Sequence, residues 1–228
     1  MAIRAILWDV DGTLLDFLAA EKAAVQRLFG EFGLGPCTDG MVARYSAIND
    51  AYWKRLERGE IPKQEVLLGR FRDFFSELGI DPGLSEPFNA RYQLALGDTV
   101  VYRDDSLSLV KSLHGRVRQY VVSNGTVVAQ TKKLSRSGLG AWMDGVFLSE
   151  ELGAEKPSPA FFRQVFAALS DMDKADMLIV GDSLTSDMKG GLAAGIPTCW
   201  YNPFHHPRPA DMAIDYEIED LHQVLELL

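Results

Sequence analysis

Short apolar runs that alternate with helical segments constrain the fold of this chain more than any other sequence feature. Such runs end at a polar or small residue and predict buried parallel strands with helices on both faces of the sheet. We expect strands at residues 3–8, 117–122, 145–148, 177–180 and 198–201, and a last short strand at 213–218. Helices are expected at 105–114, 127–137, 159–169 and 186–194, with a final helix that Asp220 caps.

One long region interrupts this alternation. Residues 17–97 show helical periodicity and no strand pattern, and glycines and prolines separate their helical stretches. We therefore predict an α/β core made of residues 1–16 and 98–228, and an all-helical insertion, residues 17–97, after the first strand. The apolar positions that carry the helical spacing are Met41, Tyr45, Ile48, Tyr52 and Leu56, and then Leu67, Phe71, Phe74 and Leu78.

Composition excludes several classes of partner. The net charge is −9 and the sequence pI is about 4.9, which argues against a nucleic acid polymer because phosphate backbones bind basic surfaces. Two cysteines, Cys37 and Cys199, give no disulfide or metal-binding pattern. The sequence offers neither a signal peptide nor a segment that could span a bilayer, so we expect a cytoplasmic protein with no membrane partner.

The first predicted strand ends in two acidic residues, Asp9 and Asp11, which are followed by Gly12 and Thr13. A carboxylate can attack a phosphate ester and form an aspartyl-phosphate, and a second acid can protonate the leaving oxygen and then activate water. A polar turn after a strand is the alternative interpretation of this segment. Alone, the motif is moderately specific for phosphate chemistry.

Later polar residues also follow predicted strands or stand before a proline. Ser123 and Asn124 follow the second strand, where they can hold phosphate oxygens, although this sequence is also an ordinary turn. Lys156 precedes a proline and could neutralise charge, although most lysines are simply solvated. Asp182 ends the fourth strand as a plausible magnesium ligand, and Asp187 could bind through water or orient Lys156.

Taken together, Asp9-Val10-Asp11-Gly12-Thr13, Ser123, Lys156 and Gly181-Asp182 through Asp187 resemble the four motifs of the haloacid dehalogenase superfamily, over the whole chain. The resemblance implies a Rossmann-like core with strand order 5-4-1-2-3 and a helical cap over the site. It implies that Asp9 is the nucleophile and Asp11 the general acid/base. It implies magnesium held by Asp9, the backbone carbonyl of Asp11 and Asp182, and a phosphoryl group bound by Ser123, Asn124 and Lys156.

The second acid favours a phosphatase over a dehalogenase, because displacing a halide needs no acid on the leaving group. Segments 14–17, 48–53, 57–61, 68–71 and 195–202 look like the pyrimidine 5′-nucleotidase subgroup, which implies a small phosphorylated metabolite as substrate. Trp8 departs from that pattern, where phenylalanine is common. Asn49 and Arg70 are the candidate contacts to base or ribose. A sugar-phosphate or phosphoglycolate-type phosphatase and a catalytically idle binding or regulatory module remain alternatives.

Overall fold

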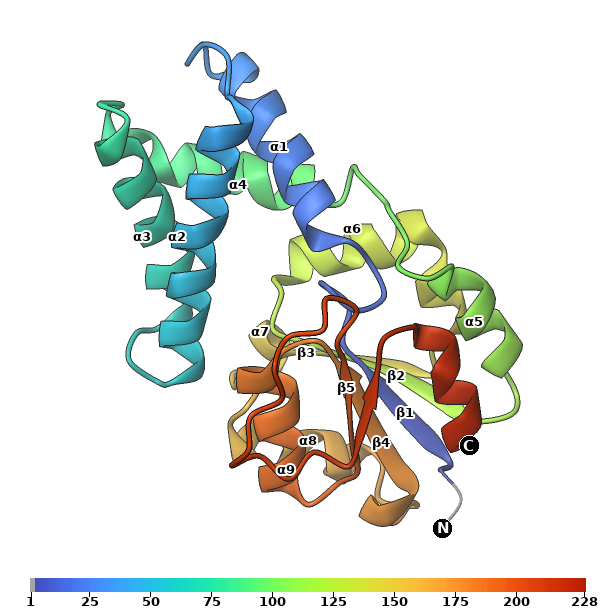
Figure 1. The fold of residues 1–228 in the computed structure, drawn as a ribbon. Helices are drawn as coiled ribbons and strands as arrows, with labels where there is room; N and C mark the ends of the chain where they lie inside the picture. The colour runs from blue at the N-terminus through green and yellow to red at the C-terminus, as the bar shows by residue number, and fades with distance from the viewer. Residues whose placement is uncertain (1–2) are drawn as a thin grey trace. The chain divides into compact units, whose positions relative to one another are not determined.

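The protein divides into two compact units in a computed structural model that describes residues 3–228 (Figure 1). The first, called here the α/β unit, contains the described residues up to Asp16 together with Val101–Val127 and Leu134–Leu228. The second, called the helical unit, contains Phe17–Val100 and Val128–Lys133. The predicted core begins at residue 1, and its first two positions lie outside the described residues.

The α/β unit is built on one parallel six-stranded sheet in the order β3-β2-β1-β4-β5-β6. The predicted Rossmann-like α/β class is confirmed, but the predicted order 5-4-1-2-3 lacks the sixth strand, which pairs with β5 at the edge of the sheet. The strands are β1 (Ala5–Trp8), β2 (Arg118–Ser123), β3 (Gly145–Leu148), β4 (Met177–Gly181), β5 (Thr198–Tyr201) and β6 (Tyr216–Ile218).

Helices cover both faces of this sheet, as the buried apolar strands require. Figure 1 shows α8 and α9 on one face, and α5 with the C-terminal helix on the other. Alternate residues of β1, Ala5 and Leu7, share a hydrophobic cluster with Phe161, Phe162 and Val165 of α8. The helices are α5 (Ser106–Leu113), α6 (Val127–Ser137), α7 (Ser149–Leu152), α8 (Pro159–Ala168) and α9 (Lys189–Ala194), with a π-helical turn at Leu184–Met188 and a C-terminal 3-10 helix at Leu221–Leu227.

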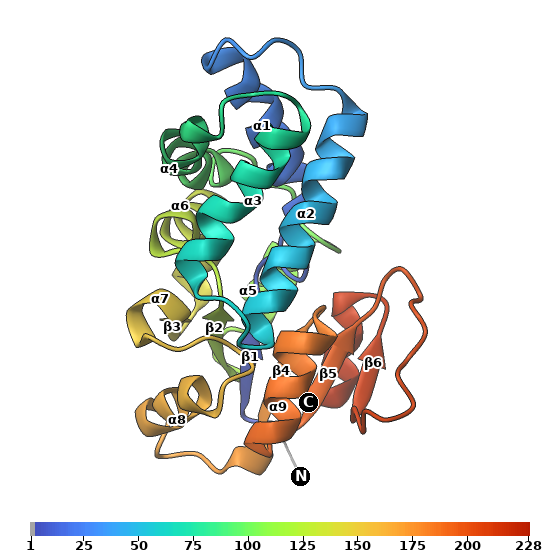
Figure 2. The ribbon, with the colours of Figure 1, turned by 90° about the vertical axis from the view of Figure 1, so that its left-hand side faces the viewer.

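The helical unit consists mainly of four helices that follow β1 in the chain. They are α1 (Phe17–Glu31), α2 (Asp39–Glu57), α3 (Lys63–Glu77) and α4 (Ser85–Leu96). Helix α2 packs against α3 and α1, and Figure 2 shows it lying beside α3. Thr38 caps α2 by accepting a hydrogen bond from the backbone N–H of Met41 at 3.2 Å. Helix α6 contributes Val128–Lys133 to this unit and its remaining residues to the α/β unit.

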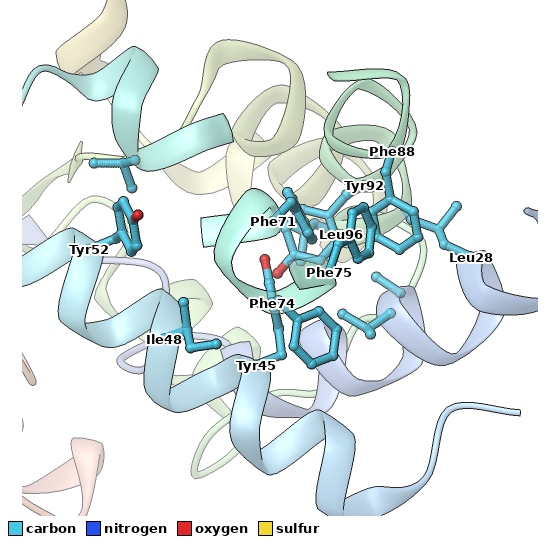
Figure 3. Close-up of a cluster of buried hydrophobic side chains, with 14 of the residues drawn as sticks. Leu28, Tyr45, Ile48, Tyr52, Phe71, Phe74, Phe75, Phe88, Tyr92 and Leu96 are labelled. Carbon is cyan, nitrogen blue, oxygen red and sulfur yellow. The ribbon is translucent and has the colours of Figure 1, made fainter. Parts of the chain in front are cut away.

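Aromatic side chains fill the core of the helical unit (Figure 3). Tyr45 of α2 stacks on Phe71 of α3 with ring centroids 5.0 Å apart, and Phe88 of α4 meets Phe75 edge-on at 5.1 Å. Each fully buried aromatic side chain contributes roughly 1.5–3 kcal/mol relative to exposure, so this cluster holds the helices together. Within residues 3–228, none of the helices combines the length and the apolarity that crossing a bilayer demands.

Candidate active site

The first half of the site is the turn that follows β1. Asp9 is buried, and its backbone N–H donates to the Val180 carbonyl of β4 at 2.9 Å. Gly12 has a φ of +94°, and a Cβ atom there would lie 2.4 Å from a carboxylate oxygen of Asp182. Glycine is therefore required at this position both by the left-handed backbone and by the close approach of Asp182.

Lys156 reaches this turn from the loop between α7 and α8. Its side chain is 1 % exposed, and its ammonium donates to Asp9 Oδ1 at 2.8 Å, to Asp187 Oδ1 at 2.6 Å and to the Val122 carbonyl at 2.7 Å. An ammonium has three hydrogens, so each hydrogen has an acceptor. The prediction that Asp187 orients Lys156 corresponds to this contact.

Asp182 directly follows β4, and Asp187 lies within the π-helical turn Leu184–Met188. The Ser183 backbone N–H donates to Asp187 Oδ2 at 3.2 Å, so each carboxylate oxygen of Asp187 accepts a hydrogen bond. A Cβ atom on Gly181 would lie 2.3 Å from the Asp187 carboxyl group, which explains the glycine at the end of this strand. Asp187 is fully buried, whereas Asp182 is exposed.

Thr13 joins the two acidic turns, and sequence reasoning assigned it no role. Its buried hydroxyl accepts from the Asp182 backbone N–H at 3.0 Å and lies 3.1 Å from Asp182 Oδ1 and 3.4 Å from Asp9 Oδ2. A single hydroxyl hydrogen can serve only one of these two carboxylates at a time. Its place in the Asp-x-Asp-Gly-Thr segment is the only signal that could have indicated this role.

The charges of the site perturb one another strongly. Burial raises the pKa of Asp9 to about 7, while Lys156 opposes this rise and Asp187 adds to it. Burial acts to lower the pKa of Lys156, but the carboxylates of Asp187 and Asp9 outweigh it and hold the pKa above its ordinary value. Asp182 is solvent-exposed but densely surrounded by protein, and loss of solvation and repulsion from Asp9 and Asp187 raise its pKa.

Asp9, Asp182 and Asp187 could together hold a metal ion. Each offers a carboxylate oxygen, and these oxygens lie within 4.8 Å of one another. Asp9 and Asp187 both pair with the Lys156 ammonium and Asp182 lies beside them, and this concentration of negative charge and the all-oxygen donor set suit a hard divalent cation such as magnesium. The predicted ligand set names the Asp11 carbonyl in place of Asp187, and that assignment stays a prediction; Asp11 is half-buried two residues after Asp9.

The two residues after β2 differ in how they contact the site. Ser123 is buried, and its hydroxyl accepts from the Gly125 backbone N–H at 3.0 Å. Asn124 bonds to the main chain of Lys156 through both ends of its amide, at 2.9 Å and 2.8 Å. Trp8, the departure noted in the sequence, is buried and donates to Gln119 Oε1 at 3.2 Å, so its indole is satisfied within the sheet.

Asn49 and Arg70, the predicted contacts to base or ribose, lie inside the helical unit. Asn49 is 3 % and Arg70 is 1 % exposed. Asn49 donates to Glu21 Oε2 at 2.9 Å and accepts from Arg70 at 2.6 Å, and Arg70 also donates to Asn89 at 3.1 Å. The guanidinium of Arg70 lies 5.1 Å from the ring centroids of both Phe71 and Tyr92. The structure thus gives both residues buried partners, and their contact with substrate stays a prediction.

Comparison with known proteins places the chain among hydrolases. A family model described as haloacid dehalogenase-like hydrolase matches residues 3–195. The pyrimidine 5′-nucleotidase PynA of Streptococcus pneumoniae is 36 % identical over 230 residues, which cover 100 % of this chain and 96 % of PynA. The pyrimidine 5′-nucleotidase YjjG of Escherichia coli is 28 % identical, covering 98 % of this chain and 96 % of YjjG.

A solved structure resembles the chain over its full length. The crystal structure of YfnB from Bacillus subtilis, a HAD-hydrolase by name, superposes with a TM-score of 0.92 at 35 % identity and covers 100 % of this chain and 99 % of YfnB. In sequence, the two proteins are 37 % identical over 99 % of this chain and 95 % of YfnB. The YfnB crystals contain bound magnesium and reveal interdomain movement in that protein.

Proposed function

Because this chain belongs to the haloacid dehalogenase-like hydrolase family, we propose that it is a magnesium-dependent phosphatase that acts through an aspartyl-phosphate on Asp9. We further propose that its substrates are pyrimidine nucleoside 5′-monophosphates. The first proposal rests on the geometry of the site, and the second on the relatives and on the sequence of the helical unit.

The observation that carries the proposal is the clamp of Lys156 between Asp9 and Asp187. Its ammonium holds one oxygen of Asp9 at 2.8 Å, which fixes the carboxylate and leaves the other oxygen, Oδ2, near Thr13 at 3.4 Å. A fixed carboxylate with one oxygen directed by a lysine is preorganised for attack on phosphorus. A carboxylate in a solvated turn would have no such partner.

In the proposed reaction, a carboxylate oxygen of Asp9 attacks phosphorus, and the bond from phosphorus to the ester oxygen breaks. Asp11 gives its proton to the departing oxygen. Asp11 then takes a proton from water, the water oxygen attacks the phosphorus of the aspartyl-phosphate, and inorganic phosphate leaves with Asp9 restored. Ser123 binds the non-bridging oxygens of the phosphoryl group through these steps, and Lys156 binds them where a phosphoryl oxygen replaces one of the three protein acceptors of its ammonium.

Asp9, Asp182 and the Asp11 carbonyl are the proposed magnesium ligands, with Asp187 behind them. When bound, the cation neutralises the repulsion between the nucleophile and the phosphate. The chain's own residues otherwise repel one another, because Asp9, Asp182 and Asp187 share the charge of a single lysine. We therefore expect chelation to remove activity and magnesium to restore it.

Pyrimidine specificity is supported by two relatives named pyrimidine 5′-nucleotidase that match nearly all of this chain. The net charge of −9 fits a small phosphorylated metabolite rather than a nucleic acid polymer. Asn49 and Arg70 stay the proposed contacts to base or ribose. A flat pyrimidine ring would fit such a contact, and a larger purine would displace the phosphate, where an error of about 1 Å costs on the order of a hundredfold in rate.

The test is kcat/KM with magnesium for deoxyuridine, thymidine and cytidine monophosphates against adenosine and guanosine monophosphates and glucose 6-phosphate. We expect the pyrimidine nucleotides to be the best substrates and a chelator to abolish turnover of all of them. A sugar phosphate as the clear best substrate would refute the nucleotidase while leaving the Asp9 chemistry. Absence of phosphate release from every ester would refute the phosphatase.

A further inference from the structure

Lys156 lies in a loop between two helices, and we propose that Asn124 is the residue that positions it. This assigns Asn124 a role different from the predicted contact with the phosphoryl group. This role rests on the proposed function only in the test that measures turnover. The hydrogen bonds that support it join Asn124 to Lys156 and involve no substrate.

The geometry of Asn124 supports this role directly. Its Nδ2 donates to the Lys156 carbonyl at 2.9 Å, and its Oδ1 accepts from the Lys156 backbone N–H at 2.8 Å. Both polar groups of the Lys156 main chain are thus bonded to one side chain, in the way that a neighbouring strand would bond them. The side-chain amide of Asn124 takes the place of that strand.

The segment that carries Lys156 needs such an anchor. It lies between the end of α7 at Leu152 and the start of α8 at Pro159, and it does not belong to the sheet. The ammonium must nevertheless reach Asp9 and Asp187 together, at 2.8 Å and 2.6 Å. The end of β2 fixes both ends of the lysine, since the Val122 carbonyl accepts from the ammonium at 2.7 Å and Asn124 holds the main chain.

The chain contains a matched control for this contact. Asn202 follows β5 as Asn124 follows β2, and it is 3 % exposed. Its Oδ1 accepts from the His206 backbone N–H at 2.9 Å, and its Nδ2 donates to the His206 carbonyl at 2.9 Å. Asn202 Nδ2 also donates to Glu217 Oε1 at 2.7 Å, so substitution of Asn202 removes an equivalent pair of main-chain bonds and one side-chain bond from a different loop of the same unit, without touching Lys156.

The first test is a double-mutant cycle measured as kcat on the best substrate. N124A should lower kcat about tenfold to a hundredfold in the wild-type background, because it displaces the ammonium. In the K156A background, the same change should cost less than about threefold, because a positioning residue has nothing left to position. Equal losses in both backgrounds would overturn the proposal and favour direct contact with the phosphoryl group. N202A should leave kcat within about twofold of wild type.

The second test needs no turnover. Hydrogen exchange of the Lys156 ammonium, followed by NMR on protein with labelled lysine, should be slow in the wild type because three acceptors hold it. N124A should speed this exchange by at least about tenfold and N202A should not, since only the first removes the two main-chain bonds to Lys156. Unchanged exchange in N124A would overturn the proposal, even if the wild type proved to have no phosphatase activity.

A further variant covers the case in which N124A does not fold. N124D keeps the size of the side chain and the acceptor for the Lys156 N–H but loses the donor to the Lys156 carbonyl. It should speed the exchange of the Lys156 ammonium less than N124A but in the same direction. Exchange as slow as in wild type would contradict the proposal.

Discussion

Each of the two units contains a cluster of polar side chains, and the two clusters differ in charge and in exposure. In the α/β unit, Asp9, Asp182 and Asp187 face the single ammonium of Lys156, and Asp182 is exposed. In the helical unit, Glu21 is bonded to neutral groups and attracted by Arg70, and all are buried among aromatic rings.

This difference separates a site for chemistry from a structural network. A concentration of carboxylates that solvent reaches at Asp182 favours binding of a cation and of a substrate. In the second cluster one carboxylate is set against one guanidinium, with Asn49 bonded to both, so the two charges of the network offset each other. We therefore expect substitutions in the first cluster to remove activity and substitutions in the second to remove stability.

The largest expected effect is at the proposed nucleophile. Asp9→Asn should lower kcat by more than about a thousandfold, because an amide is a far poorer nucleophile and a weaker metal ligand. The melting temperature should not fall, since the change removes one of the mutually repelling carboxylates. Phosphate release measures kcat and thermal unfolding measures the melting temperature, each on the variant and on the wild type. Activity above about a tenth of wild type would remove Asp9 from this role.

A smaller effect is expected where a glycine meets a carboxylate. Gly12→Ala should lower kcat about a hundredfold, because its Cβ would lie 2.4 Å from Asp182 Oδ2 and must displace it. Gly33→Ala in the helical unit is the matched control: its φ is also positive, at +67°, but no atom lies within 4 Å of the added Cβ. The control should lose about 1–2 kcal/mol of stability and keep its kcat. Equal kcat values for the two variants would contradict the close approach.

In the helical unit the expected effect is on stability. Asn49→Ala should lower the free energy of unfolding by about 3 kcal/mol, because it breaks the bonds to Glu21 and Arg70 and leaves both buried. The neighbouring Asp50→Ala removes only an exposed pair with Lys54 and should change stability by less than about 1 kcal/mol. Denaturant unfolding measures the free energy of unfolding of both variants. Equal losses of this free energy in the two variants would contradict a buried network. The pyrimidine preference of Asn49→Ala tests the predicted base contact separately.

The smallest expected effect is a pH dependence at Glu21. Burial raises the pKa of Glu21 above its ordinary 4.5, so the folded state binds its proton more tightly than the unfolded state does. Its stabilising contribution is therefore complete below pH 4.5 and is lost as the pH rises through the folded pKa. The stability of wild type relative to Glu21→Gln should fall as pH increases from 4.5. A stability of wild type relative to Glu21→Gln that rises with pH would contradict a raised pKa of Glu21.

Sequence patterns indicate which residues gather in the α/β unit more readily than they do in the helical unit, for a physical reason. Asp9, Ser123 and Asp182 stand where buried strands end, and both the strand pattern and the turn that follows are local features. The bond between Asn124 and Lys156 joins loops far apart in the chain, so no local pattern indicates it. The contact of Asn49 and Arg70 with base or ribose stays a prediction, because helical spacing does not distinguish a buried polar residue from one that meets a ligand.

The fold shows the same division between local and distant information. Strands at 145–148 and 198–201 were predicted at their observed bounds, because short apolar runs mark them. The single turn α7 carries too few residues for a periodic pattern and was not predicted. The sixth strand was expected from residue 213 but begins at Tyr216, and its place beside β5 depends on a long loop whose path the sequence does not specify.

The central claim is that a phosphoryl group passes through Asp9, and trapping that group tests it most directly. Asp11→Asn removes the proposed base that activates water, so the aspartyl-phosphate should accumulate when this variant is mixed with magnesium and substrate and quenched in acid. Mass spectrometry of the peptide that contains Asp9 should then show one added phosphoryl group, at Asp9 and not in the Asp9→Asn variant. Phosphate release without any phosphoryl group on that peptide, or with the group on another residue, would contradict the account.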